Sequence, residues 1–267
     1  MKHSPSPVAY GALLAICGTL FMQSANAGQA PAAPQTPKAA APVDLTGQWV
    51  SVITEDWRWR MVTPLKGDFA NIPVNAAAKA VGEQWDPARD EAQGEQCKGY
   101  GALAIMREPG RFRVSWQDDT TLKIETDSGA QTRLLHFAGA PSGGERQLQG
   151  YSQAQWQPGP GGRGPFGRGG FGIGIVRVGN QSNSLEVATS QIRPGYLRKN
   201  GIPFSEDAKL TEYFDVVREP SGQEWLVITS IVEDPKYLNE PWVTSINLKK
   251  EKDADRSKWQ PTPCSAR

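Results

Sequence analysis

Residues 111–137 have the sequence RFRVSWQDDTTLKIETDSGAQTRLLHF, in which apolar and polar side chains alternate at most positions. Turn-forming residues interrupt the alternation at Asp118-Asp119 and at Ser128-Gly129. This alternation is typical of half-buried strands, and short turns between such strands produce an antiparallel meander. The stretch therefore predicts consecutive strands at residues 111–117, 120–126 and 130–137.

The same alternation continues on both sides of this meander. It predicts further strands at residues 46–54, 57–61, 102–107, 148–157, 174–178, 185–193, 209–218, 224–232 and 243–249. One short helix is expected after the second strand, at residues 76–84. Asn75 is a favourable N-cap for it, and Asp86-Pro87 ends its pattern.

About ten strands with short turns and a single helix predict an all-β domain built from one antiparallel sheet. A sheet of this size has to hide its edges, and the simplest way is to close into a barrel. We therefore expect a single antiparallel meander barrel. A two-layer β-sandwich is the alternative.

The ends of the chain differ in composition from the strands. Residues 1–27 have a basic start, an apolar stretch and the small-x-small sequence Ala25-Asn26-Ala27, the pattern of a secretory signal peptide. Residues 28–42 are rich in Ala and Pro, which is typical of an extended linker. The rest of the chain is then divided into a barrel domain at residues 43–264, its flexible Gly/Arg-rich loop at residues 158–172 and a tail at residues 265–267.

The charges of the chain nearly balance, with 29 basic and 28 acidic side chains, and 38% of its residues are hydrophobic. This is an ordinary folding composition, which excludes wholesale disorder. The near-zero net charge provides no overall field to attract nucleic acid or an acidic membrane, so no nucleic-acid partner is expected. The signal peptide predicts a periplasmic or secreted protein without a membrane span in its mature form.

Removal of the signal peptide leaves two cysteines, Cys97 and Cys264. In an exported protein, two cysteines predict one disulfide, which here would tie the C-terminal tail back to a loop. Two buried free thiols are the alternative. Two cysteines without a C-x-x-C spacing do not complete a zinc site, and no metal or organic cofactor is expected.

The segment that opens the first predicted strand, Asp44-Leu45-Thr46-Gly47-Gln48-Trp49, resembles the G-x-W start of lipocalins and related small-ligand barrels. Thr211-Glu212-Tyr213 resembles a second lipocalin signature. The resemblance implies a lipocalin-like barrel in which the tryptophan closes one end and an arginine packs over it.

The chain as a whole resembles a group of exported bacterial proteins with no assigned activity. The resemblance is carried by residues 54–61 (TEDWRWRM), 94–97 (GEQC), 193–201 (RPGYLRKNG) and 233–238 (EDPKYL). It implies export and a β architecture, and no particular activity.

His136 is the only histidine outside the signal peptide. A single histidine excludes multi-histidine metal sites and H-E-x-x-H peptidases, and the sequence has no G-x-S-x-G nucleophile motif. His136 alternates with Leu135 and Phe137 on a predicted strand, which favours a structural role. In an enzyme it would be the natural proton shuttle.

Charged and aromatic residues follow the first predicted strand in the order Glu55, Asp56, Trp57, Arg58, Trp59 and Arg60. A second acidic pair, Glu233 and Asp234, ends one of the last predicted strands. Because early and late strands are often neighbours in a closed barrel, we expect the two acidic pairs to lie close together. Four carboxylates beside arginines could clamp a polar ligand, hold Ca²⁺ or shift one another's pKa. A salt-bridged rim is the alternative.

Residues 193–201 form an aromatic and basic segment with two turn signals, and loops on rigid barrels often carry function. Its Tyr196, Arg198 and Lys199 could engage an anionic or carbohydrate ligand, and an ordinary surface loop is the alternative. The candidate ligand-binding residues are therefore Trp57, Arg58, Trp59, Arg60, Tyr196, Arg198, Asp234 and Tyr237. The candidate catalytic residues are Glu55, Asp56, Arg60, His136 and Glu233.

The sequence leaves three classes of function open. The favoured one is binding of a small, partly apolar ligand in a Trp-lined barrel. The second is a cofactor-free lyase or isomerase that uses barrel carboxylates and His136 for proton transfer. The third is a structural envelope protein without catalysis. The fold alone does not choose among them.

Overall fold

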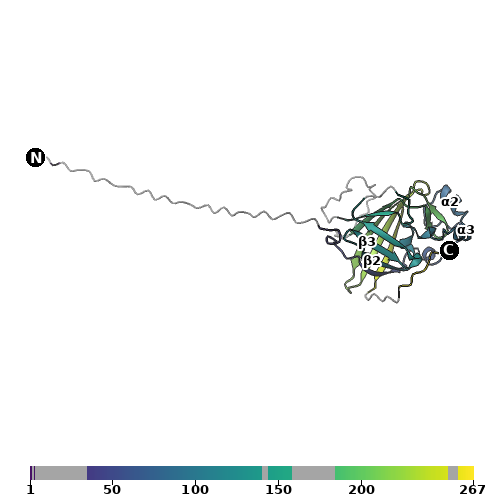
Figure 1. The fold of residues 1–267 in the computed structure, drawn as a ribbon, viewed down its shortest axis with the longest axis horizontal. Coiled ribbons are helices and arrows are strands. Elements are labelled where there is room, and N and C mark those ends of the chain that lie inside the picture. Colours follow the sequence, from purple (N-terminus) through teal and green to yellow (C-terminus); the bar gives the residue numbers. More distant parts are fainter. Residues whose placement is uncertain (2, 4–34, 140–143, 158–183, 252–257) are drawn as a thin grey trace. The chain divides into compact units, whose positions relative to one another are not determined.

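Nine strands close into a barrel in the order β1-β11-β10-β9-β6-β5-β4-β3-β2, and β2 pairs with β1 to complete the ring (Figure 1). The computed structural model describes residues 1, 3, 35–139, 144–157, 184–251 and 258–267. The barrel strands are β1 (Gly47–Val52), β2 (Arg111–Trp116), β3 (Thr121–Thr126), β4 (Thr132–His136), β5 (Tyr151–Trp156), β6 (Ser184–Ser190), β9 (Lys209–Arg218), β10 (Glu224–Glu233) and β11 (Trp242–Lys250). The closed ring confirms the predicted all-β barrel and excludes the two-layer sandwich.

One neighbouring pair in the ring is parallel, which corrects the prediction of a wholly antiparallel barrel. β4 and β5 run in the same direction and pair only at Leu135 with Ser152 and at His136 with Gln153. A closed ring of nine strands cannot alternate direction throughout, because an odd number leaves two neighbours pointing the same way. The β4–β5 pair is therefore the seam of the barrel, and it has the shortest ladder in the ring.

Two of the predicted strands are wrong. Residues 57–61 begin with the short helix α1 (Trp57–Arg60), because Asp56 adopts left-handed backbone angles, with φ at 50°, and turns the chain out of β1. Residues 102–107 contain the 3-10 turn η2 (Ile105–Arg107), and residues 102–106 are buried without alternation. A short apolar run fits a buried turn as well as a strand. The strand predicted at residues 174–178 lies outside the described residues.

Asn75 starts α2 (Ala76–Gly82) as predicted, since its side-chain oxygen accepts a hydrogen bond from the backbone nitrogen of Ala78 at 3.0 Å. Asp86-Pro87 starts a further helix, α3 (Pro87–Ala92), so the prediction of a single helix is wrong. Asp86 caps α3 with its side chain, and proline is favoured at the first helical position. Within the described part of the chain, no helix has the length and apolar character needed to cross a bilayer.

A second layer of structure covers one end of the barrel. β7 (Gly195–Arg198) and β8 (Ile202–Phe204) form a hairpin between β6 and β9, where the sequence predicts a loop. The hairpin and α2 contribute to a second buried cluster, and Figure 1 shows α2 and α3 at the same end of the barrel. We call residues 55–108 and 191–208 the cap.

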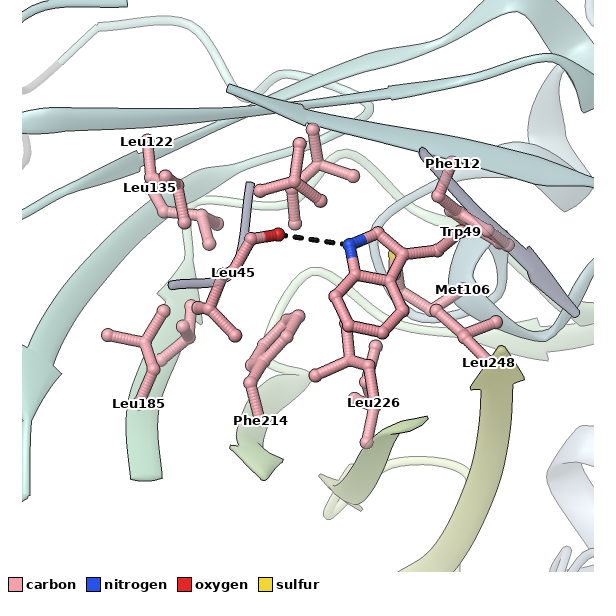
Figure 2. Packing of buried hydrophobic residues seen from close by; sticks show 14 of the residues in the cluster. Leu45, Trp49, Met106, Phe112, Leu122, Leu135, Leu185, Phe214, Leu226 and Leu248 are labelled. Atoms are coloured by element: carbon pink, nitrogen blue, oxygen red, sulfur yellow. Dashed lines mark hydrogen bonds between the residues drawn. The ribbon is translucent and has the colours of Figure 1, made fainter. Parts of the chain in front are cut away.

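Side chains fill the barrel interior around Trp49. Figure 2 shows the indole of Trp49 enclosed by apolar side chains from strands around the ring, among them Phe112, Leu122, Leu135, Leu185, Phe214, Leu226 and Leu248. The indole nitrogen donates to the carbonyl oxygen of Leu45 at 2.9 Å, so its polar atom is satisfied. Where the resemblance implies an arginine over this ring, Lys250 lies 5.2 Å from the ring centre. Trp116 and Trp156 pack against the edge of the same core.

Residues that precede the first strand close the other end of the barrel. The indole nitrogen of Trp156 donates to the carbonyl oxygen of Pro37 at 2.9 Å. The backbone nitrogen of Lys38 donates to the carbonyl oxygen of Asp119 at 3.2 Å. Val43 packs against the barrel core. Residues 35–42, the second half of the predicted linker, therefore contact the barrel end that lies opposite the cap.

A buried ion pair crosses the barrel interior beside the seam. Arg133 on β4 donates to both carboxylate oxygens of Glu212 on β9, with a shortest contact of 2.6 Å, and their side chains are 0% and 1% exposed. Between these strands, Thr189 on β6 bonds Ser152 on β5 at 2.8 Å and accepts from Arg133 at 3.4 Å. These polar side chains join all four strands around the seam.

We predict that breaking this pair on one side costs more stability than removing both charges. Arg133→Met or Glu212→Leu alone leaves a buried charge unpaired and should lower the free energy of unfolding by about 3–5 kcal/mol. The Arg133→Met/Glu212→Leu double variant should lose much less than the sum of the two single variants. Urea unfolding of the four proteins measures the coupling. Additive losses would contradict it.

The predicted disulfide is confirmed. Cys97 and Cys264 are bonded, with Cα atoms 5.1 Å apart and a separation of 167 positions in sequence. The backbone nitrogen of Thr262 also donates to the carbonyl oxygen of Asp127 at 2.8 Å. The bond therefore fixes the C-terminal residues beside the cap, where Figure 1 shows the C-terminus near α3.

Loss of this disulfide should destabilise the whole domain, because it closes a loop that contains most of the barrel. We expect Cys97→Ser/Cys264→Ser to lower the free energy of unfolding by about 2–5 kcal/mol. Urea unfolding with and without a reductant measures this, and the double variant should no longer respond to the reductant. A parent protein whose unfolding is unchanged by full reduction would contradict the prediction.

Candidate functional site

Three arginines from separate segments of the cap converge on one small cavity. Arg60 ends α1, Arg107 ends η2 and Arg198 ends β7. The cavity leaves about 20 Å³ for the centre of a water-sized molecule, which is room for about one water or a small ion. Its wall is completed by polar and aromatic residues that include Asp56, Trp59, Asn71, Glu108 and Trp242.

Arg60 is held inside the cap by neighbours on both sides. Its side chain is 2% exposed, its Nε donates to the carbonyl oxygen of Arg107 at 2.9 Å, and its Nη1 bonds the carboxylate of Glu55. Its Nη2 is buried and has no hydrogen-bond partner among the described residues. A residue that lines the cavity thus carries an unused buried donor.

Arg107, like Arg60, uses one terminal nitrogen to bind a carboxylate and has the other buried. Its Nη2 donates to the carboxylate of Asp56 at 2.6 Å, and its guanidinium lies 5.1 Å from the ring centre of Trp242. Its Nη1 is buried and, within the described ranges, has no hydrogen-bond partner. Asp56 also accepts from the side chain of Asn71 at 3.1 Å, so this carboxylate is occupied by the cap itself.

Arg198 and Lys199 reach the same region from the β7–β8 hairpin. Arg198 donates to the backbone oxygens of Asp68 and, at 3.0 Å, of Ala70, which fixes its guanidinium against the chain that follows α1. Lys199 lies 3.4 Å from the carboxylate of Glu108 and bonds the hydroxyl of Tyr100 at 3.1 Å. The hairpin therefore adds two positioned cations to those of α1 and η2.

Burial shifts the protonation equilibria of this cluster. It lowers the pKa of Arg60 despite an acidic partner, and the charge of Arg107 lowers it further. It lowers the pKa of Arg198 to about 10, again with a contribution from Arg107. Burial also raises the pKa of Glu108, and the attraction of Lys199 offsets that effect only in part. The site thus holds crowded cations beside a carboxyl group that takes up a proton more readily than usual.

A polar groove adjoins the cavity and shares part of its wall. It leaves about 220 Å³ for the centres of water-sized molecules. Trp59, Arg60, Glu108 and Arg198 line both spaces, and Lys199 lines the groove. We call the cavity and the groove together the basic pocket. Its chemistry is provided by Trp59, Arg60, Arg107, Glu108, Arg198, Lys199 and Trp242.

The basic pocket contains several of the residues predicted from sequence. Asp56, Trp59, Arg60 and Arg198 line its cavity, and Glu55 pairs with Arg60 behind it. Four polar and aromatic residues of the wall were not predicted from the sequence, namely Asn71, Arg107, Glu108 and Trp242. The only signal for Arg107 and Glu108 was a charged pair directly after the apolar run at residues 102–106.

The second acidic pair does not join the first. Asp234 is buried and accepts from both the backbone nitrogen and the hydroxyl of Ser205, at 2.6 and 2.8 Å. Glu233 is exposed and lies opposite Lys209 in the register at the end of the β9–β10 ladder. No hydrogen bond or ion pair between described residues links this pair to Glu55 or Asp56. Nowhere among the residues that the structure describes are three or more His, Cys, Asp or Glu side chains grouped so that they could hold a metal ion.

Two predicted ligand-binding tyrosines have structural contacts instead. Tyr196 donates its hydroxyl to the buried carboxylate of Asp90 at 2.8 Å, and burial followed by this bond raises its pKa. Tyr237 packs against the second buried cluster, with the ammonium of Lys236 5.2 Å from its ring centre. Neither lines the basic pocket.

His136 lies at the barrel end opposite the cap. β1 leads into Glu55 at the cap end, and the register places the start of β4 at that same end, so His136 finishes β4 at the other. Its ring stacks on Tyr151 with the ring centres 4.8 Å apart. The structure therefore separates His136 from Glu55 and Glu233, the carboxylates predicted to share proton transfer with it.

The remaining candidates, Trp57 and Arg58, lie on the outer side of α1. Trp57 is exposed, and the guanidinium of Arg58 lies 5.5 Å from the ring centre of Trp59. They line an apolar hollow that adjoins the basic pocket and shares Trp59, Met61, Thr63 and Pro64 with its groove.

Known proteins offer no assignment for this site. Comparison of the chain with protein-family models, with curated proteins and with solved structures gives no match. The function therefore has to be argued from the geometry of the basic pocket.

We predict that His136 titrates below its ordinary value of 6.5, because burial disfavours the charged ring and the opposing charge of Asp118 is the smaller effect. A lowered pKa of a base favours the neutral ring in the folded state. The stability it provides is therefore complete above pH 6.5 and is lost as the pH falls through the folded pKa.

Proton NMR of the imidazole signals measures this pKa, and His136→Gln identifies the resonance by removing it. The same variant should flatten the dependence of stability on pH in this range. A midpoint at or above 6.5 would contradict the prediction.

Proposed function

We propose that this chain is an exported binding protein that holds a small, partly apolar anion in the basic pocket. The anionic group would be a carboxylate or a phosphate, whose oxygens accept from several guanidinium donors at once. The site proposed here is the rim of the barrel beneath the cap, since apolar side chains occupy the interior around Trp49.

The observation that carries this proposal is the pair of unused donors on Arg60 and Arg107. Buried polar groups are almost always hydrogen-bonded, and an unpaired one costs about 1–3 kcal/mol, more where the group is charged. Both nitrogens belong to residues that line the same cavity. An anion bound there would offer acceptor oxygens to residues whose buried donors are unpaired.

The carboxylates of the pocket do not oppose such a ligand strongly. Asp56 is engaged by Arg107 and Asn71, and Glu108 is engaged by Lys199. Since burial raises the pKa of Glu108, its negative charge is lost early as the pH falls. Binding of an anion should therefore strengthen as the pH is lowered through this pKa.

Aromatic side chains supply the apolar part of the proposed ligand site. Trp59 and Trp242 both line the cavity, where the guanidinium of Arg107 already lies 5.1 Å from the ring centre of Trp242. Flat aromatic faces beside cationic donors suit a ligand with an apolar body and an anionic end.

Export is supported by the Cys97–Cys264 disulfide, because such bonds form and persist in oxidising compartments. The predicted signal peptide at residues 1–27 is consistent with this and lies outside the described residues apart from residues 1 and 3. We therefore propose a periplasmic or secreted location.

A structural envelope protein is the second candidate, and the filled barrel interior favours it. A core packed around Trp49 needs no ligand for stability, so the barrel would serve as a scaffold and the ionic contacts of the cap would only fix its geometry. Ligand binding at the basic pocket distinguishes the two candidates.

Isothermal titration with sulfate and with benzoate tests the proposal, since sulfate probes the donors and benzoate adds an apolar body. We expect both to bind the parent protein, and Arg107→Gln to weaken binding by about 10–100-fold, the effect of losing charge-assisted hydrogen bonds. Arg107→Lys should recover little, because it keeps the charge and loses the planar donors.

Arg218→Gln is the matched control, since Arg218 is exposed on β9 at the end away from the cap, and it should bind as the parent does. Sulfate keeps its double charge while a carboxyl group with a raised pKa titrates, so the pH dependence of its binding reports on the protein. Glu108→Gln should remove the pH dependence. No measurable heat from either anion, or equal losses in Arg107→Gln and Arg218→Gln, would favour the scaffold.

A further inference from the structure

The segment that follows β1 presents large apolar side chains to solvent. Trp57, Met61, Val62 and Leu65 are 67%, 58%, 70% and 76% exposed. All four line one shallow hollow at residues 57–68. Isolated exposed apolar residues are ordinary, but a group of this size on one short segment marks a contact surface.

The backbone of this segment is fixed by polar contacts. The side chain of Asn200 donates to the carbonyl oxygens of Leu65 and Asp68 at 3.0 and 2.9 Å. Trp59 donates to the carboxylate of Asp68 at 3.2 Å, and Gly67, with φ at 80°, completes a tight turn there. Because the cap anchors the backbone from within, the apolar side chains are presented outward.

Positive charge accompanies the apolar side chains. Residues 57–67 contain Arg58, Arg60 and Lys66 and no acidic residue. Arg60 is turned inward and paired, whereas Arg58 and Lys66 are exposed, and no ion pair between described residues involves either of them. The free charge on this surface is therefore positive.

We propose that residues 57–67 insert their apolar side chains into the surface of an anionic lipid bilayer. Tryptophan favours the level of the lipid headgroups, and methionine, valine and leucine lose contact with water when they pass below it. Arg58 and Lys66 flank these side chains and would meet the lipid phosphates. This inference is independent of the anion proposed for the basic pocket.

The surface of a lipid bilayer fits this segment better than a small ligand or a second copy of the chain does. A small molecule in the hollow would cover only those parts of Val62 and Leu65 that line it, and these side chains are 70% and 76% exposed. A symmetric dimer built on this patch would bring the two copies of Arg58 and Lys66 into one interface, to which residues 57–67 contribute no acidic residue, and like charges repel. An anionic bilayer covers the apolar faces and neutralises both cations.

Co-sedimentation of the mature protein with lipid vesicles tests the inference. We expect binding to vesicles that contain phosphatidylglycerol and weak binding to pure phosphatidylcholine. Arg58→Gln/Lys66→Gln should reduce the partition coefficient by about fivefold for each charge removed. Val62→Glu/Leu65→Glu should reduce it by at least about tenfold, since two apolar side chains no longer leave water.

Both glutamate substitutions lie at exposed side chains, so thermal unfolding should be unchanged and sulfate binding at the basic pocket should be retained. Val243→Glu is the matched control, because Val243 on β11 is also exposed, at 49%, and lies outside the hollow. Its vesicle binding should equal that of the parent. A vesicle partition unaffected by Val62→Glu/Leu65→Glu would overturn the inference. A dimer that this variant dissociates, in a parent that does not bind vesicles, would also overturn it.

Discussion

Closure of a ring with an odd number of strands imposes a parallel pair on this barrel, and buried polar side chains join the strands around that seam. The β4–β5 ladder contains two residue pairs, so backbone hydrogen bonds alone hold it weakly. Arg133 and Glu212 compensate from inside, because their contact joins β4 to β9 past the seam. In a low-dielectric core a charged side chain is tolerated only when its partner is present, because an unpaired buried charge is costly. Arg133 and Glu212 satisfy this condition through a bidentate contact among apolar side chains.

Apolar side chains occupy the barrel interior, and the basic pocket lies at the barrel rim. β1 leaves the barrel into α1, the chain re-enters at β2 after η2, and the β7–β8 hairpin is inserted between β6 and β9. The first of these two excursions contributes Arg60 and Arg107 to the cavity, and the second contributes Arg198. The basic pocket is therefore a product of the cap, and the barrel serves as the frame that brings distant segments together.

Alternation predicted the barrel strands well because each has one face in the core. It failed where burial followed another geometry: residues 102–106 are all buried in an irregular turn, and Arg133 and Glu212 occupy inward positions that a hydrophobic pattern assigns to apolar residues. Part of the pocket was foreseeable, since Trp59, Arg60, Arg198 and Lys199 stand in unusual aromatic and charged segments. The pairing of Asp56 with Arg107 was not, because contacts between segments far apart in sequence leave no local signal.

The sequence TEDWRWRM shows the effect of taking a helical turn for a strand. As a strand, its tryptophans would share one face and its arginines the other. In α1 the side chains are distributed around a helical turn, so that Arg60 points into the cap while Trp57 and Arg58 remain exposed. One turn of helix thus separates a buried donor from an exposed apolar surface. The hollow and the groove of the basic pocket are neighbours that share Trp59, Met61, Thr63 and Pro64. Val62 and Leu65 line only the hollow, so substitutions there leave the guanidinium contacts of Arg60 within the cap intact.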